Sequence, residues 1–142
     1  MANFYGSYVG FGSSGPVALA GNFYQGENYA YAMGGGPGPY DNRVQKYGLV
    51  SGGDATEVGV LTQTVMVCKG TSSATYGYRG GGGYPTSAVI DKTSFSSDGD
   101  SVAITATLSS VRTDMNTSSS ETHGFWAGGY ALTDTIEKVT FD

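Results

Sequence analysis

The chain repeats a short pattern at an interval of 46 to 47 residues. Three of its four lysines stand 46 residues apart, and a pair of glycines precedes each of the three. An aromatic residue lies four positions before the second glycine of every pair. The lysines are Lys46, Lys92 and Lys138, and the aromatic residues are Tyr31, Tyr78 and Phe125. Self-similarity at such a period is typical of proteins that repeat one supersecondary unit.

The distance from the second glycine to the lysine changes along the chain. It is 11 residues in the first copy, 10 in the second and 9 in the third, while the other spacings hold. Length variation confined to one interval is typical of a loop between strands, and the prolines in the first two intervals favour a turn. We therefore expect three turns on one common face, each carrying one tyrosine: Tyr40, Tyr84 and Tyr130.

The composition favours strands over helices. The 142 residues include 24 glycines but only five leucines and three isoleucines, so good helix formers are scarce. Apolar residues alternate with small or polar ones at Val102, Ile104, Ala106 and Leu108. This period of two predicts a half-buried strand with these four side chains on its buried face. The sequence predicts an almost helix-free, all-β protein with antiparallel strands.

The repeats predict three units, at residues 25–71, 72–118 and 119–142, of which the last is a half. Residues 1–24 form a separate N-terminal segment, either closing strands or a docking arm. Three or four strands in about 46 residues is the size of a propeller blade, and closed propellers typically have about 4–8 blades. About three blades would leave sheet edges exposed. We therefore expect assembly with other chains.

The glycine pair that follows an aromatic strand resembles kelch-type β-propeller repeats. The stretch Thr122–Gly129, followed by Ile136, Lys138 and Phe141, also resembles repeats in structural proteins of tailed bacteriophages. The resemblance covers residues 25–142. It implies antiparallel propeller-like blades and a non-enzymatic role in a virion, as a fibre, baseplate or capsid-surface protein. The implied partners are copies of the chain, other virion proteins and a host-surface glycan.

Charge and cysteine content exclude several classes of protein. The net charge is −5 and the basic residues are scattered, so we expect no nucleic-acid binding. The chain has neither a signal-peptide pattern nor an apolar run long enough to cross a bilayer, so we expect synthesis in a host cytoplasm and no membrane insertion. The resemblance to phage proteins implies a location in the virion. One cysteine, Cys68, allows no internal disulfide and no cysteine-based zinc site.

Few residues suggest catalysis or metal binding. The only histidine, His123, could form a triad with Ser120 and an aspartate, but Tyr76 holds the same place in the preceding unit. Tyrosine cannot replace a catalytic imidazole, so we expect no catalytic residue, metal or cofactor. Asp98-Gly99-Asp100 lacks the further carboxylates of a calcium loop and is interpreted as a solvated turn.

The three turn tyrosines are the candidate binding residues. Exposed tyrosines in loops make good binding anchors because they lose little conformational entropy. Tyr40, Tyr84 and Tyr130 would then contact a ligand or a partner from one face. This pattern supports a second hypothesis, a carbohydrate-binding β-propeller lectin of cellular origin that stacks tyrosines on sugar rings.

Replacement of the only histidine should have little effect on the protein. We expect His123→Ala to leave the fold and any binding largely intact, with a change in unfolding free energy within about 0.5 kcal/mol, as at ordinary surface sites. Thermal melts of the two purified proteins measure this. Tightly held copper or zinc in an elemental analysis of the wild-type protein would contradict it.

Overall fold

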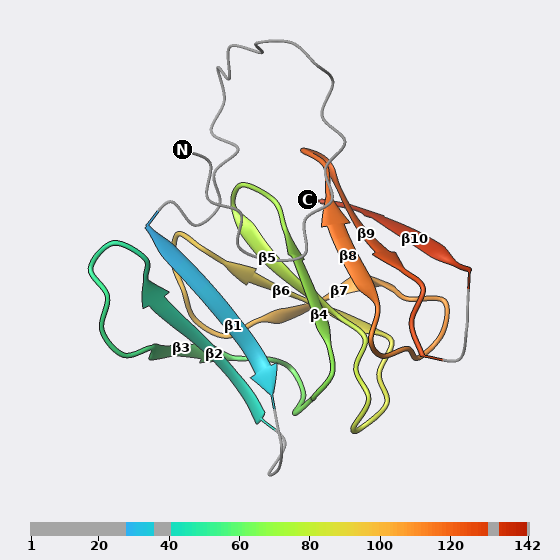
Figure 1. The fold of residues 1–142 in the computed structure, drawn as a ribbon, viewed down its shortest axis with the longest axis horizontal. Coiled ribbons are helices and arrows are strands. Elements are labelled where there is room, and N and C mark those ends of the chain that lie inside the picture. The colour runs from blue at the N-terminus through green and yellow to red at the C-terminus, as the bar shows by residue number, and fades with distance from the viewer. Residues whose placement is uncertain (1–27, 36–40, 131–133, 142) are drawn as a thin grey trace.

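The computed structural model describes residues 28–35, 41–130 and 134–141 (Figure 1). All regular structure among these residues is strand, arranged in three small antiparallel sheets. This confirms the all-β prediction. The described residues contain no helix that could span a membrane. The predicted N-terminal segment, residues 1–24, and the turn tyrosine Tyr40 lie outside the described residues.

Each sheet is built from strands that follow one another in the chain. The first contains β1 (Tyr29–Gly35), β2 (Asp41–Gly48) and β3 (Thr56–Val60). The second contains β4 (Lys69–Ser72), β5 (Tyr76–Gly80), β6 (Val89–Ser94) and β7 (Val102–Thr107). The third contains β8 (Asn116–Ser119), β9 (His123–Ala127) and β10 (Ile136–Thr140). All three sheets are therefore meanders.

The first strands of the second and third sheets lie side by side (Figure 1). The Thr71 hydroxyl in β4 donates to the Ser118 carbonyl in β8 over 3.0 Å, and the Thr117 hydroxyl in β8 donates to the Gly70 carbonyl in β4 over 2.7 Å. Strand β4 also crosses the expected boundary between the first two units and pairs with β5. These reciprocal hydrogen bonds join the two sheets along one edge of each.

The three lysines of the 46-residue pattern have the same register in their sheets. Each lies on the second strand of a hairpin, opposite the aromatic residue of the strand before it. The pairs are Lys46 with Tyr31, Lys92 with Tyr78, and Lys138 with Phe125. The spacing in the sequence therefore corresponds to one recurring cross-strand position.

The glycine pairs permit a close approach that other residues would block. Gly34 and Gly81 have φ angles of +66° and +68°, in the left-handed region. A Cβ atom would lie 2.8 Å from the Val65 carbonyl oxygen at Gly34, and 2.6 Å from the Arg112 carbonyl oxygen at Gly81. The next glycine in each pair donates its N–H to that same carbonyl over 3.0 Å. The glycine pair thus holds the end of the strand against the loop that follows the same sheet.

The apolar core is divided into two small clusters. One joins buried residues of the first sheet and the loop after it: Val44, Leu61 and Val65. The other joins buried residues of the second and third sheets and of the loop between them: Tyr78, Ile90, Leu108, Met115, Trp126 and Val139. Large aromatic side chains fill the second cluster, where Phe141 stacks on Tyr78 with ring centroids 4.7 Å apart. The apolar core therefore needs few aliphatic side chains.

The prediction that the apolar face at residues 102–108 is buried is wrong for most of that face. Val102 is 57% exposed and Ala106 is also exposed, whereas Ile104 is half-buried and only Leu108 is buried. Strand β7 is the last strand of its sheet, at the outer edge. Alternation separates two faces of a strand, but burial also requires a second layer on one of them. Most of the apolar face of β7 has no such cover among the described residues.

Val67 generates a prediction about stability. Its φ is +57°, and Asp114, 47 residues later, has φ +54°. A left-handed conformation costs a β-branched residue about 1–2 kcal/mol, whereas asparagine tolerates it. We expect Val67→Asn to raise the unfolding free energy by about 1 kcal/mol in urea titrations.

The control for this variant is Val111→Asn. Val111 is 54% exposed and is not among the residues with positive φ. The same side-chain change should therefore give no gain there. Equal effects of the two variants would contradict the assignment of strain to Val67.

Candidate interaction surface

The turn between β6 and β7 connects the second sheet to the first. The Asp98 carboxylate accepts hydrogen bonds from the Tyr31 hydroxyl and from the Lys46 ammonium, each over 2.9 Å. Lys46 also lies over the Tyr29 ring, 4.3 Å from its centroid. The turn was expected to be solvated, but Asp98 binds protein groups of the neighbouring sheet. No pattern in the sequence indicated that Asp98 joins two sheets.

Backbone groups of the same turn lie against β3. The Gly99 N–H donates to the Val58 carbonyl over 2.7 Å, and the Ser101 N–H donates to the Val60 carbonyl over 2.8 Å. A side chain at Gly59 would place a Cβ atom 2.1 Å from the Gly99 carbonyl oxygen, so this contact requires a glycine. The turn therefore packs directly on the outer strand of the first sheet.

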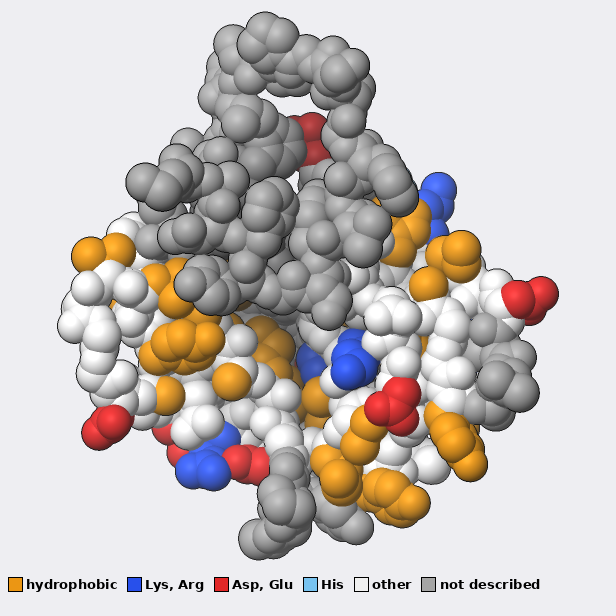
Figure 2. All heavy atoms as spheres, in the orientation of Figure 1, with side chains coloured by type: hydrophobic (Ala, Val, Ile, Leu, Met, Phe, Trp, Pro, Cys, Tyr) orange, Lys and Arg blue, Asp and Glu red, His pale blue; other side chains and the backbone are white. Residues whose placement is uncertain are grey.

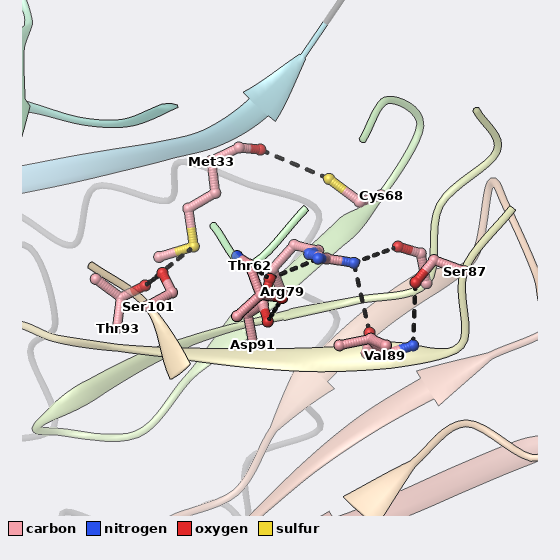
Figure 3. Close-up of polar contacts among 10 residues, drawn as sticks. Met33, Thr62, Cys68, Arg79, Ser87, Val89, Asp91, Thr93 and Ser101 are labelled. Atoms are coloured by element: carbon pink, nitrogen blue, oxygen red, sulfur yellow. Dashed lines mark hydrogen bonds and ion pairs between the residues drawn. The ribbon is translucent and has the colours of Figure 1, made fainter. Parts of the chain in front are cut away.

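A buried ion pair lies beneath this junction (Figure 3). Arg79 and Asp91 face each other across β5 and β6 over 2.5 Å, and both are fully buried. The Asp91 carboxylate also accepts from the Thr62 hydroxyl over 2.6 Å and from its N–H over 3.3 Å. Arg79 donates to the Gly81 carbonyl over 2.9 Å. Asp91 thus links the loop after the first sheet to the second sheet.

The junction of the second and third sheets has the same chemistry. Glu137 forms an ion pair with Arg112 and accepts from the N–H and hydroxyl of Ser109, over 2.8 and 2.9 Å. Arg112 also donates to the Gly128 carbonyl over 3.0 Å. Glu137 follows Asp91 by 46 residues. At both junctions a carboxylate on the second strand of a hairpin binds the loop that follows the preceding sheet.

A groove of about 690 Å³ lies between β7 and β10. It is lined by residues 102–107, residues 137–140 and Lys92. Among the described strands, none pairs with the outer edge of β10. The apolar side chain of Val102 is exposed in this groove, and Ile136, at the start of β10, is 70% exposed. An open strand edge beside exposed apolar groups is a template for pairing with another strand.

The surface carries few charges. Only 13% of residues are charged, and Figure 2 shows mostly polar and hydrophobic side chains on the viewed face. Such a surface offers little electrostatic repulsion to another acidic chain.

The expected turn tyrosines are exposed where the structure describes them. Tyr84 is 60% exposed and Tyr130 is 79% exposed. Their backbones are held by the loops behind them, since Tyr84 forms a bridge with Met66 and the Tyr130 N–H donates to the Thr113 carbonyl over 2.9 Å.

The residues considered for catalysis are not arranged as a triad. The His123 imidazole contacts the Thr122 hydroxyl over 2.8 Å, whereas the Ser120 hydroxyl bonds backbone groups of His123 and Thr122. Burial raises the pKa of the Cys68 thiol. Within the described ranges, no three histidine, cysteine or acidic side chains are placed to hold a metal ion.

Comparison with known proteins adds no relative. The chain matches no protein-family model, and a search of curated proteins finds no match.

Asp98 generates a prediction about alkaline stability. The hydrogen bond to Asp98 raises the pKa of Lys46 above 10.5, and burial, reinforced by Asp98, raises the pKa of Tyr31 above 10.0. Both shifts favour the protonated forms in the folded state, so their contribution is present below pH 10 and is lost as pH rises above it. Asp98→Asn should cost about 1 kcal/mol at pH 8 and flatten this alkaline loss.

Denaturant titrations of both proteins between pH 8 and pH 11 measure these effects. Asparagine retains the shape of aspartate and tolerates its φ of +53°. Parallel stability curves across this pH range would contradict the role of the carboxylate.

Proposed function

We propose that this protein is a non-enzymatic structural component of a tailed-phage virion that acts by assembly with other chains. The observation that carries the proposal is the open outer edge of β10 beside the groove along β7. Unpaired N–H and C=O groups on an edge gain hydrogen bonds when another strand adds to them. Assembly with copies of itself and with other virion proteins would cover such edges.

Three further features support an incomplete propeller-like array. The lysines share one register, all three glycine pairs have positive φ angles, and two sheet junctions share one type of carboxylate contact. We interpret the three sheets as copies of one blade-like unit. An array of about three blades has two ends, which favours association.

The virion assignment is supported by the resemblance of residues 25–142 to repeats in tailed-phage structural proteins. The chain is then made in the host cytoplasm and works in a fibre, in a baseplate or on a capsid surface. Host-surface attachment through a glycan is part of the same proposal, since such a protein faces the host.

The alternative is a carbohydrate-binding lectin, which the exposure of Tyr84 and Tyr130 favours. In that case the double variant Tyr84→Ala/Tyr130→Ala would abolish binding on a glycan array. A phage attachment protein also binds glycans, so the array alone does not separate the two. The lectin hypothesis differs in requiring no association between chains.

Light scattering after size-exclusion chromatography tests the assembly proposal. We expect a mass that is a multiple of 14.6 kDa and rises with concentration. Val102→Lys adds a charge on the open strand β7 and should weaken association, because edge charges oppose strand pairing.

Val111→Lys is the matched control, because Val111 has nearly the same exposure but lies outside the strands. It should leave association unchanged. A folded, monodisperse monomer at every concentration would contradict the assembly proposal.

A further inference from the structure

We propose that the first sheet of one copy of this chain packs on the third sheet of a second copy, in the way that successive sheets pack within the chain. The inference rests on the proposed assembly function and names the partner and the surfaces that meet. Leu49 and Tyr47 of one copy would contact Phe125 of the other. Because the two surfaces differ, the contact is head to tail and leads to closed rings or open filaments.

Both junctions within the chain contain the same aromatic contact. The residue directly after the second strand of a hairpin lies against an aromatic ring of the preceding sheet. Phe95, after β6, lies 4.8 Å from Tyr31 between ring centroids. Phe141, after β10, lies 4.7 Å from Tyr78. Phe141 follows Phe95 by 46 residues, so one position of the repeat packs on the sheet before it.

A second position on the same strands also faces the preceding sheet. It lies two residues earlier, on the same side of an extended strand. The Thr93 hydroxyl contacts the Met33 sulfur of the first sheet over 4.0 Å. Val139 belongs to the buried cluster that contains Tyr78 of the second sheet. Thr93 and Val139 are both buried, so each of these two sheets packs on its predecessor through two side chains of one strand.

The first sheet carries the same two positions, but there the side chains are exposed. The Leu49 N–H donates to the Asn28 carbonyl over 2.8 Å, the same backbone contact that Phe95 makes with Thr75. Leu49 is nevertheless 48% exposed, and Tyr47, two residues earlier, is 40% exposed. The first sheet therefore presents to solvent the groups that the later sheets use to pack on a preceding sheet.

The exposed groups form a continuous apolar segment. Val50, directly after Leu49, is 81% exposed, so three exposed apolar side chains lie within four residues. Exposed apolar groups that gather in one place are typical of protein interaction sites. This segment therefore indicates a protein contact independently of the repeat.

The third sheet carries the matching aromatic ring. Phe125 follows Tyr78 by 47 residues and lies opposite Lys138, in the register that Tyr78 has with its own lysine. Tyr78 is fully buried and stacks on Phe141 of the next sheet, whereas Phe125 is half-buried. A leucine packed on Phe125 would add a third contact of the same kind.

The arrangement of the sheets requires two copies for this contact. The first and third sheets lie on opposite sides of the second sheet (Figure 1). Leu49 therefore lies away from Phe125 of the same chain. A second copy is a partner for which the structure supplies both surfaces.

Charge is complementary at the proposed contact. At the first junction, the turn that follows Phe95 brings the Asp98 carboxylate to Lys46 over 2.9 Å. The turn that follows Leu49, residues 51–54, is exposed and ends in an aspartate. Sheets packed in the same manner would place this acidic turn beside Lys138, which is exposed.

Cross-linking between two cysteine variants of the full chain tests the proposal. Leu49→Cys and Phe125→Cys are prepared separately and mixed with a short bis-maleimide reagent. We expect about tenfold more covalent dimer in the mixture than in either variant alone, because a head-to-tail contact raises the effective concentration of unlike positions only. The wild-type chain, whose single thiol is the partly buried Cys68, gives the background.

Leu49→Glu tests the same contact without any change to the third sheet. A carboxylate placed against the Phe125 ring loses hydration without gaining a partner, so the dissociation constant of self-association should rise about tenfold in light scattering. Val111→Glu is the matched control, because Val111 is 54% exposed and receives the same charge elsewhere. It should leave the dissociation constant unchanged.

Equal cross-linking in the mixture and in the single variants, or equal effects of the two glutamate variants, would overturn the proposal. Cross-linking of Leu49→Cys to itself would instead assign this surface to a symmetric contact. A monomeric chain with an unreactive Leu49→Cys thiol would assign it to residues 1–27 of the same chain. Association weakened by Val102→Lys but not by Leu49→Glu would overturn the sheet contact and retain the proposed assembly. A reactive thiol in a chain that stays monomeric at every concentration would contradict both.

Discussion

The rest of the structure depends on two carboxylates, which join the second and third sheets to the loops before them. Asp91 is fully buried and binds Arg79 within its sheet and Thr62 in the preceding loop. Glu137, whose side chain is 13% exposed, binds Arg112 and Ser109, which both lie in the loop before its sheet. Such a pair is costly to break, at about 3–5 kcal/mol when one partner is lost, because the other charge stays buried. With so few aliphatic residues in the core, these polar junctions set how successive sheets are placed.

Junctions of this kind connect each sheet to the next one along the chain. They do not by themselves close the sheets into a ring. The acidic turn before β7 covers the outer strand of the first sheet, and the loop after β7 is held by the third sheet. At the next step along the chain, β7 and β10 instead border a groove. The proposed assembly follows from this difference between two places that are otherwise built alike.

The sequence predicted the strands and their spacing better than it predicted burial or contacts. The 46-residue spacing of the lysines corresponds to one register. Each lysine lies on the second strand of a hairpin, opposite the aromatic residue of the first strand. Alternation at Val102 could not show that β7 is an outer strand without cover. The role of Asp98 was missed because its partners, Tyr31 and Lys46, lie more than 50 residues away in sequence. An acidic residue directly before two of the lysines, at Asp91 and Glu137, was the available signal for the buried junctions.

Residue-resolved hydrogen exchange by NMR on the dilute, monomeric chain tests the central claim, that the series of sheets ends in an open edge at β10. Amides in β6 are flanked by β5 and β7, whereas β10 has only β9 beside it among the described strands. The amides of residues 136–140 that face away from β9 should therefore exchange faster than the amides of residues 89–94 that face away from β5. Equal protection of the two strands in the dilute chain alone would contradict the account.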